Sequence, residues 1–281
     1  MRKIKASQIT EMVKRLFLKA NYYIGDDIIA ALKSANEKES SEIGKSVLGM
    51  ILKNNEIAAK EEIAICQDTG LAILFIKLGQ EVNIVDGSFS EAINEGVERA
   101  YVDGYLRKSC VTDPVIDRKN TSTNTPAIIY TDIVPGDKIH FLVAPKGFGS
   151  ENMSALAMLK PADGVKGAID FIVETVKKAG PNPCPPTIVG VGIGGTSELA
   201  MMIAKKATLR RIGEHNPDTR YADMEIESLR RINALGIGPG GLGGNTTSLA
   251  VNIDYAPTHI AGMPIAVNIC CHAARHAEGV L

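Results

Sequence analysis

The sequence has 281 residues, of which 45% are apolar and 22% are charged, and its formal net charge at pH 7 is −1. These values are typical of a globular chain with ample material for a core, arranged as one large domain or two closely associated ones. Neither sign of charge is concentrated in long blocks, so nothing indicates a nucleic-acid or membrane partner.

The N-terminal segment and the cysteines indicate the compartment. Residues 1–23 are basic, but Lys, Arg and Glu interrupt their apolar positions, so the apolar core of a signal peptide is missing. No apolar run approaches the length of a membrane span. The five cysteines are an odd number, which argues against a disulfide framework and for a reducing compartment. We therefore expect a cytoplasmic protein.

The first sixty residues predict a helical N-terminal layer. Apolar positions recur at helical spacing in three stretches, which are residues 9–17, 28–32 and about 41–59. A strand is expected at residues 71–82. Ser88 has Glu91 three residues later, a capping-box pattern that predicts a helix reaching about Arg107.

The rest of the chain alternates strands and helices. A polar loop at residues 113–126 precedes two strands, 127–133 and 138–144, and the turn between them predicts an antiparallel pair. Further elements are expected as helices at 164–178, 197–207 and 222–235, and as strands at 187–195, 251–255 and up to 269, with a turn at Ala256–Pro257. Together they predict an α/β (α+β) chain with mixed sheets.

The stretch from Ile63 to Gly70, IAICQDTG, is the first candidate site. An apolar, strand-like run ends in Cys66, and Gln67 and Asp68 add an amide and a carboxylate before the turn. Such a cluster at the end of a strand is typical of a site. A lone cysteine after apolar residues is also typical of a small buried hydrophobe, so the stretch by itself leaves both interpretations open.

The other cysteines extend this hypothesis. Cys184 lies in GPNPCPP, where the prolines exclude helix and predict an extended backbone. Cys270 and Cys271 end the last strand-like run. Cysteines this far apart, without a CxxC pair, fit a structural zinc site poorly. Three of them can hold three irons of a 4Fe-4S cluster and leave the fourth iron open.

Three glycine-rich segments are candidate binding loops. Residues 146–152, KGFGSEN, can bring backbone N–H groups close to an anionic oxygen. Residues 190–195, GVGIGG, have the spacing of a dinucleotide fingerprint, but no acidic residue follows at the end of a second parallel strand. Residues 236–244, GIGPGGLGG, predict a close approach to a ligand or another chain, with a flexible linker as the alternative.

Six motifs resemble those of the class I, iron–sulfur fumarate hydratases. They are CQDTG at 66–70, RKNTSTNTPA at 118–127, KGFGSEN at 146–152, GPNPCPPTIVGVGIGG from Gly180, GPGGLGGNTT from Gly238 and THIAGMPIAVNICCHAARH at 258–276. More narrowly, the chain resembles the alpha subunit of the two-subunit form, and it is also similar in pattern to the alpha subunit of L(+)-tartrate dehydratase. The resemblance extends over nearly the whole chain from about residue 10.

The resemblance implies a 4Fe-4S cluster with three cysteine ligands, Cys66, Cys184 and Cys271. Cys271 is preferred to Cys270 because the family's ligand is the second residue of this pair. The fourth iron, which has no protein ligand in the family, would act as a Lewis acid on the substrate's hydroxyl and a carboxylate.

The resemblance also implies a substrate site. Gln67 and Asp68 would contact the substrate, with Asp68 near the leaving hydroxyl as a proton donor. His259 and Arg107 would bind carboxylates, for which the forked guanidinium of an arginine is well shaped. The backbone N–H of Gly149 would also meet the substrate. Asp68 and His259 are the expected catalytic residues.

A beta subunit is implied because fused relatives carry a second domain that supplies further basic residues and a threonine base, and this sequence has no such segment. We expect residues 1–281 to form a single catalytic alpha-subunit domain, with helices around mixed sheets, in an alpha2-beta2 assembly. The expected reaction is reversible hydration of fumarate to (S)-malate. Dehydration of L(+)-tartrate to oxaloacetate, a nucleotide-binding module and a non-catalytic iron–sulfur subunit are the alternatives.

Overall fold

The computed structural model describes residues 1–281, which divide into two compact units. Unit 1 comprises Met1–Ile24, Asn55–Phe148 and Arg275–Leu281, and unit 2 comprises Gly25–Asn54 and Gly149–Ala274. Each unit is assembled from segments that are distant in the sequence. That residues 1–281 act as one catalytic domain stays a prediction.

The three N-terminal helices are confirmed. Helix α1 (Ala6–Tyr22) belongs to unit 1 and α2 (Asp26–Lys38) to unit 2, whereas α3 (Glu42–Glu61) begins in unit 2 and ends in unit 1. The predicted apolar stripe of α1 is its buried face, which includes Ile9, Val13 and Phe17. A short strand that the sequence analysis missed, β1 (Arg2–Lys5), precedes α1 and pairs in parallel with β3 (Val82–Val85).

Unit 1 is built on a four-stranded sheet with the order β10-β5-β2-β4. Its strands are β2 (Leu71–Gly79), β4 (Ile128–Val134), β5 (Ile139–Lys146) and β10 (Ala277–Val280). The predicted antiparallel pairing of β4 with β5 is wrong, because β2 lies between them, parallel to β4 and antiparallel to β5. The physical reason is burial: β2 is almost entirely buried and takes a central place, whereas β4 is largely exposed and lies at the edge.

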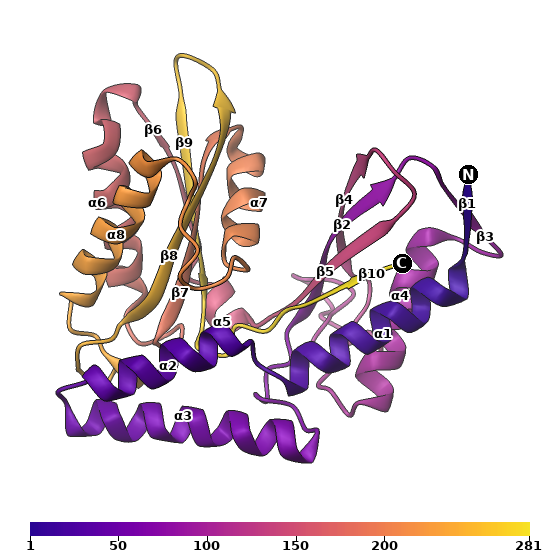
Figure 1. The fold of residues 1–281 in the computed structure, drawn as a ribbon, viewed down its shortest axis with the longest axis horizontal. Coiled ribbons are helices and arrows are strands. Elements are labelled where there is room, and N and C mark those ends of the chain that lie inside the picture. Colours follow the sequence, from indigo (N-terminus) through magenta and orange to yellow (C-terminus); the bar gives the residue numbers. More distant parts are fainter. The chain divides into compact units, whose positions relative to one another are not determined.

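Two helices complete unit 1. Helix α1 packs on α4 (Phe89–Asp103) and on strands β5 and β10 (Figure 1). The predicted cap of α4 is confirmed, since the Glu91 N–H donates to the Ser88 side chain at 3.4 Å. Helix α4 ends at Asp103 rather than at Arg107, so Arg107 lies in the irregular segment that follows the helix.

Unit 2 is built on a second mixed sheet, with the order β6-β9-β7-β8. Its strands are β6 (Ala155–Leu159), β7 (Thr187–Gly195), β8 (Ser248–Thr258) and β9 (Met263–Cys270). Helices α6 (Gly164–Ala179) and α8 (Thr219–Asn233) cover one face, and α7 (Ser197–Ala207) covers the other (Figure 1). The mixed sheets between helices confirm the predicted α/β class. The short helices are α5 (Phe148–Glu151), η1 (Pro161–Asp163) and η2 (Pro239–Gly241).

The predicted turn at Ala256–Pro257 is wrong, because β8 continues to Thr258 and the chain turns only at residues 259–262. Proline has no N–H for the ladder, but β8 is an edge strand, where a missing donor can face away from the sheet.

The GVGIGG glycines serve the packing of α7 on β7. A Cβ on Gly190 would lie 2.1 Å from the Ala204 carbonyl oxygen, and one on Gly192 would lie 2.1 Å from that of Ala200. Both glycines lie inside the strand rather than in a strand-to-helix turn. Their spacing therefore reflects a close helix–strand contact, which removes the basis for the nucleotide-binding interpretation.

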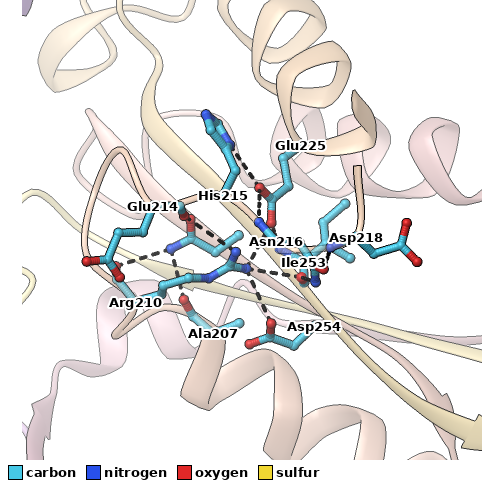
Figure 2. Close-up of polar contacts among 10 residues, drawn as sticks. Ala207, Arg210, Glu214, His215, Asn216, Asp218, Glu225, Ile253 and Asp254 are labelled. Carbon is cyan, nitrogen blue, oxygen red and sulfur yellow. Dashed lines mark hydrogen bonds and ion pairs between the residues drawn. The ribbon is translucent and has the colours of Figure 1, made fainter. Parts of the chain in front are cut away.

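A buried carboxylate fastens the loop after α7 to helix α8 and strand β8 (Figure 2). Glu225 accepts the N–H of Ile253 at 2.8 Å and that of Asn216 at 3.2 Å. It also pairs with the Arg210 guanidinium at 2.8 Å and lies 2.9 Å from His215 Nδ1. Because all these contacts converge on one acceptor group, we assign the network a structural role.

Candidate active site

The Cys66–Gly70 turn lies in an irregular connection between α3 and β2. The predicted strand before Cys66 is absent, because the Ile65 N–H donates to the Asn21 carbonyl of α1 and not to a sheet. Both oxygens of Asp68 accept backbone N–H groups, Oδ1 from Gly70 at 3.0 Å and Oδ2 from Phe148 at 2.8 Å. The carboxylate is therefore held in one orientation.

Asp68 and Arg107 line the same cavity in unit 1, which has a volume of about 510 Å³. The remaining lining residues are Gly70, Leu71, Ser109, Cys110, Val111, Pro114, Arg118 and Phe148. Thr69 Oγ1 donates to the Arg107 carbonyl at 2.9 Å, which joins the turn directly to the arginine's segment. Gln67 is exposed and lies beside Cys66, whose Sγ is 3.5 Å from the Gln67 amide oxygen. The structure thus brings an acid and an arginine together.

Buried polar side chains that the sequence did not predict lie against the Cys66–Gly70 turn. The Tyr101 hydroxyl donates to the carbonyl oxygens of Thr69 at 2.7 Å and Gly70 at 3.0 Å. Burial raises the pKa of Tyr101, and the nearby charge of Asp68 raises it further, whereas Arg275 acts in the opposite direction. Tyr101 therefore stays a neutral donor throughout the physiological range. No local signal marks it, because a tyrosine on the apolar face of a helix looks like an ordinary core residue.

Arg275 is a second missed residue. Only 3% of it is exposed, its Nη1 donates to Asn21 Oδ1 at 3.2 Å, and its Nε has no hydrogen-bond partner. A Cβ on Gly147 would lie 3.2 Å from Asp68 Oδ2 and 3.5 Å from Arg275 Nη2. The glycine therefore leaves room for a buried cation close to the Asp68 carboxylate.

Two predicted cluster ligands lie at one end of the unit 2 sheet. Strands β7 and β9 are antiparallel with Ile188 opposite Cys270, so the segment before β7 and the segment after β9 meet at the same end. Accordingly, the His272 N–H donates to the Cys184 carbonyl at 3.4 Å. Cys184 is exposed and Cys271 half-buried, whereas Cys270 is only 7% exposed.

The prediction of an extended backbone at Cys184 is wrong. Its φ is +53°, in the left-handed region, and its N–H donates to the Pro181 carbonyl at 3.0 Å. The physical reason is that residues 181–184 form a turn, which the Cys184 N–H closes on the Pro181 carbonyl. Gly149 borders this turn, since a Cβ on it would lie 3.7 Å from the Asn182 carbonyl oxygen. Cys66 belongs to unit 1, and no group of three or more His, Cys, Asp or Glu side chains that could hold a metal ion is found.

His259 lies far from these cysteines within unit 2. It follows β8 in the turn before β9, whereas Cys271 follows the other end of β9. Eight residues of strand separate the two ends, a distance of about 25 Å at the usual rise per residue. His259 is exposed, and its Nδ1 accepts the Ala261 N–H at 3.1 Å. The structure therefore does not bring His259 to the cysteine end of its own sheet.

The segment that follows the loop 236–244 is held by a side chain of its own unit. Buried Glu39 accepts the N–H of Asn245 at 2.9 Å and that of Thr246 at 3.2 Å. Burial raises the pKa of Glu39, but its bonds from the backbone N–H groups of Asn245, Ser41, Thr246 and Ser40 outweigh this and leave the pKa below its ordinary value. An intramolecular carboxylate thus accounts for the order of the segment after the glycines.

Comparisons with known proteins place this geometry in context. Residues 10–280 match the family model described as "Fumarate hydratase (Fumerase)". The chain is 44% identical over 274 residues to a putative L(+)-tartrate dehydratase subunit alpha of Methanocaldococcus jannaschii, covering 96% of each chain. It is 31% identical over 277 residues to the L(+)-tartrate dehydratase subunit alpha of Escherichia coli K12, covering 98% of this chain and 90% of the relative.

Proposed function

The chain belongs to the fumarate hydratase (Fumerase) family and is a hydro-lyase, and we propose that it is the alpha subunit of an iron–sulfur enzyme acting on a four-carbon dicarboxylate. The observation that supports this best is the cavity shared by Asp68 and Arg107. Hydration of a dicarboxylate needs a group that exchanges a proton with the hydroxyl and a cation that holds a carboxylate. The two side chains supply these groups.

Cys66, Cys184 and Cys271 are the proposed ligands of a 4Fe-4S cluster. The exposed thiol of Cys184 and the half-buried Cys271 suit this role, because soft thiolates are the ligands that iron–sulfur clusters use. When bound, the cluster supplies an iron without a protein ligand, which acts as a Lewis acid toward the leaving hydroxyl. Buried Cys270 is the less suitable member of its pair.

The chain's own residues orient the substrate and move the proton. We assign to Asp68 the exchange of a proton with the substrate's hydroxyl, and to Arg107 the binding of one carboxylate. Gln67 and the Gly149 N–H add polar contacts. Charge that develops beside a carboxylate during the reaction is stabilised by fixed donors and cations, and we assign this role to Arg107.

A role for His259 at the substrate requires a second chain. About 25 Å of strand separates His259 from the cysteine end of its own unit, which is longer than a four-carbon acid can span. We therefore propose that His259 binds a carboxylate at the site of a neighbouring alpha subunit. A histidine supplied by a neighbouring alpha subunit fits the proposed alpha2-beta2 assembly. The alpha-subunit names of the relatives imply a beta subunit, and we propose that it completes each site. We place this assembly in the cytoplasm.

Two substrates are candidates. The family description supports fumarate, which would be hydrated to (S)-malate. The names of the relatives equally support L(+)-tartrate, which would be dehydrated to oxaloacetate. Both acids carry two carboxylates, but they differ in their hydroxyl groups. Polar contacts to the hydroxyl groups must therefore distinguish the two acids.

One experiment tests the proposal and separates the substrates. The alpha chain is reconstituted anaerobically with iron and sulfide, and turnover of fumarate and of tartrate is measured with and without its beta subunit. We expect cluster absorbance and turnover of one of the two acids only when the beta subunit is present. A folded chain that binds no cluster, or a loaded complex inactive on both acids, would contradict the proposal.

A further inference from the structure

The Asp68 and Arg107 side chains are carried by two irregular segments of unit 1. Helix α4 ends at Asp103 and strand β2 begins at Leu71, so neither side chain belongs to a helix or strand. The hydrogen bonds of regular secondary structure therefore do not set the distance between them. Other contacts must do so, because catalysis loses about a hundredfold when reacting groups are misplaced by about 1 Å.

The side chain of Asn124 connects the two segments. Its Nδ2 donates to the Gly70 carbonyl at 3.1 Å, and its Oδ1 accepts the N–H of Ser109 at 2.7 Å and that of Cys110 at 3.1 Å. Asn124 is 0% exposed, and these bonds use both ends of its amide. Its φ of +59° lies in the left-handed region, which asparagine and aspartate tolerate better than other side chains do.

Two further contacts strengthen the connection. Thr69 Oγ1 donates to the Arg107 carbonyl at 2.9 Å, and the Tyr101 hydroxyl donates to the Thr69 carbonyl at 2.7 Å. Thr69 and Tyr101 are both buried. Buried hydrogen bonds are directional and costly to leave unmade, so this set of contacts holds the two segments in one arrangement.

We propose that Asn124 is a positioning residue, which sets the position of Asp68 relative to Arg107 through its bonds to Gly70, Ser109 and Cys110. Asn124 does not line the cavity and acts only through these segments. This inference rests on the proposed function, because its catalytic consequence requires that Asp68 and Arg107 act on one substrate.

The substitution Asn124→Asp tests the proposal by removing the hydrogen bond from the Asn124 side chain to the Gly70 carbonyl. Aspartate keeps an Oδ1 acceptor for the N–H groups of Ser109 and Cys110 and places an oxygen against the Gly70 carbonyl. For the cluster-loaded alpha–beta complex, we expect kcat to fall at least about tenfold. Hydrogen exchange of the two N–H groups should stay slow, which shows that their segment remains folded.

Asn94→Asp is the matched control. The Asn94 side chain also accepts a backbone N–H, that of Ala127 at 2.8 Å, and donates to a backbone carbonyl, that of Ser90 at 2.9 Å. These bonds do not reach the segments that carry Asp68 and Arg107. We expect this variant to stay within about twofold of the wild-type kcat. Tyr101→Phe provides a second test, because it removes a donor from the same turn without adding a charge, and it should also lower kcat.

The outcomes separate the two proposals. Wild-type kcat in Asn124→Asp would overturn the positioning role of Asn124. If the wild-type complex is inactive on both acids, the proposed function fails. Crystal structures of the full alpha chain then still test whether Asn124 sets the position of Asp68 relative to Arg107. The distance between the Asp68 and Arg107 side chains should then change in Asn124→Asp and not in Asn94→Asp, and an unchanged distance in both would overturn the inference.

Discussion

At the scale of single residues, the chemistry of the proposed site depends on the fixed carboxylate of Asp68. Both of its oxygens accept backbone N–H groups, and buried Arg275 lies close to it beside Gly147. A side chain held in this way loses little rotamer freedom when a substrate binds, because its orientation is already fixed.

Asp68→Asn should abolish most turnover while the cluster is retained. The amide keeps the shape of the side chain but cannot exchange a proton with the hydroxyl, and such a loss is typically about a hundredfold or more in kcat. Turnover and cluster absorbance are measured on the same preparation. Asp132→Asn, on the exposed edge strand β4, is the matched control and should behave as wild type. Unchanged turnover of Asp68→Asn would exclude the assigned role.

The cysteine assignment predicts loss of iron in three variants and not in two others. Cys66→Ser, Cys184→Ser and Cys271→Ser should each prevent a stable cluster, because serine is a poor ligand for iron–sulfur clusters. Cys110→Ser should leave the iron content unchanged, and so should Cys270→Ser, whose side chain is buried. Iron and sulfide are quantified after anaerobic reconstitution. Loss of iron in Cys270→Ser with retention in Cys271→Ser would reverse the choice between the two.

At the scale of elements, one buried carboxylate holds the segment that follows the glycine-rich loop 236–244. Glu39, at the end of α2, accepts backbone N–H groups from the segment that leads into β8. The glycines permit the tight path of the loop, and Glu39 fixes where it ends. This contact joins segments about two hundred residues apart, as the separation of Glu39 and Asn245 shows.

Glu39→Gln should destabilise the protein in a pH-dependent way. The pKa of Glu39 is lower in the folded state than in the unfolded state, so its contribution is present above the unfolded-state pKa and is lost as pH falls through the folded-state pKa. Near neutral pH we expect a loss of about 1–3 kcal/mol in the free energy of unfolding, since an amide mispairs with N–H donors. Urea titrations at several pH values measure this.

The control for that experiment is Glu37→Gln. Glu37 lies in the last turn of α2, just before Glu39, but is exposed, so its replacement should change the free energy of unfolding very little. The difference between wild type and Glu39→Gln should shrink as the pH becomes acidic, whereas Glu37→Gln should stay close to wild type throughout. A pH-independent difference for Glu39→Gln would contradict the assigned role of its charge.

At the scale of the whole molecule, the placement of His259 predicts that active sites share residues between alpha subunits. A His259→Ala chain and a Cys271→Ser chain should each be inactive when assembled alone with the beta subunit. A mixed assembly should regain activity, because one of its sites combines the intact cysteines of one chain with the intact histidine of the other. Turnover is measured after the two variants are unfolded and refolded together.

The control mixes a His259→Ala chain with an Asp68→Asn/His259→Ala chain, in which no intact histidine exists and no activity should return. Recovery only in the first mixture would support sharing. No recovery in either mixture, with mixed assemblies demonstrated by mass, would show that His259 does not act across chains.

The sequence by itself determined most of the elements and the family. Helices α1, α2, α3, α4, α6 and α7 and strands β2, β7 and β9 follow from apolar periodicity and capping signals, which act between residues close in the chain. The motifs around Cys66, Cys184 and Cys271 identified the family because they keep chemical groups in fixed local order.

Only the tertiary structure decided how distant segments meet. It placed β2 between β4 and β5, put Cys184 in a left-handed turn, separated His259 from Cys271, and buried Asn124 beside the Cys66–Gly70 turn. Each of these features depends on burial or on a hydrogen bond between residues far apart in sequence. Local periodicity carries no information about such partners, since the free energy that selects them arises only when distant segments of the chain pack together.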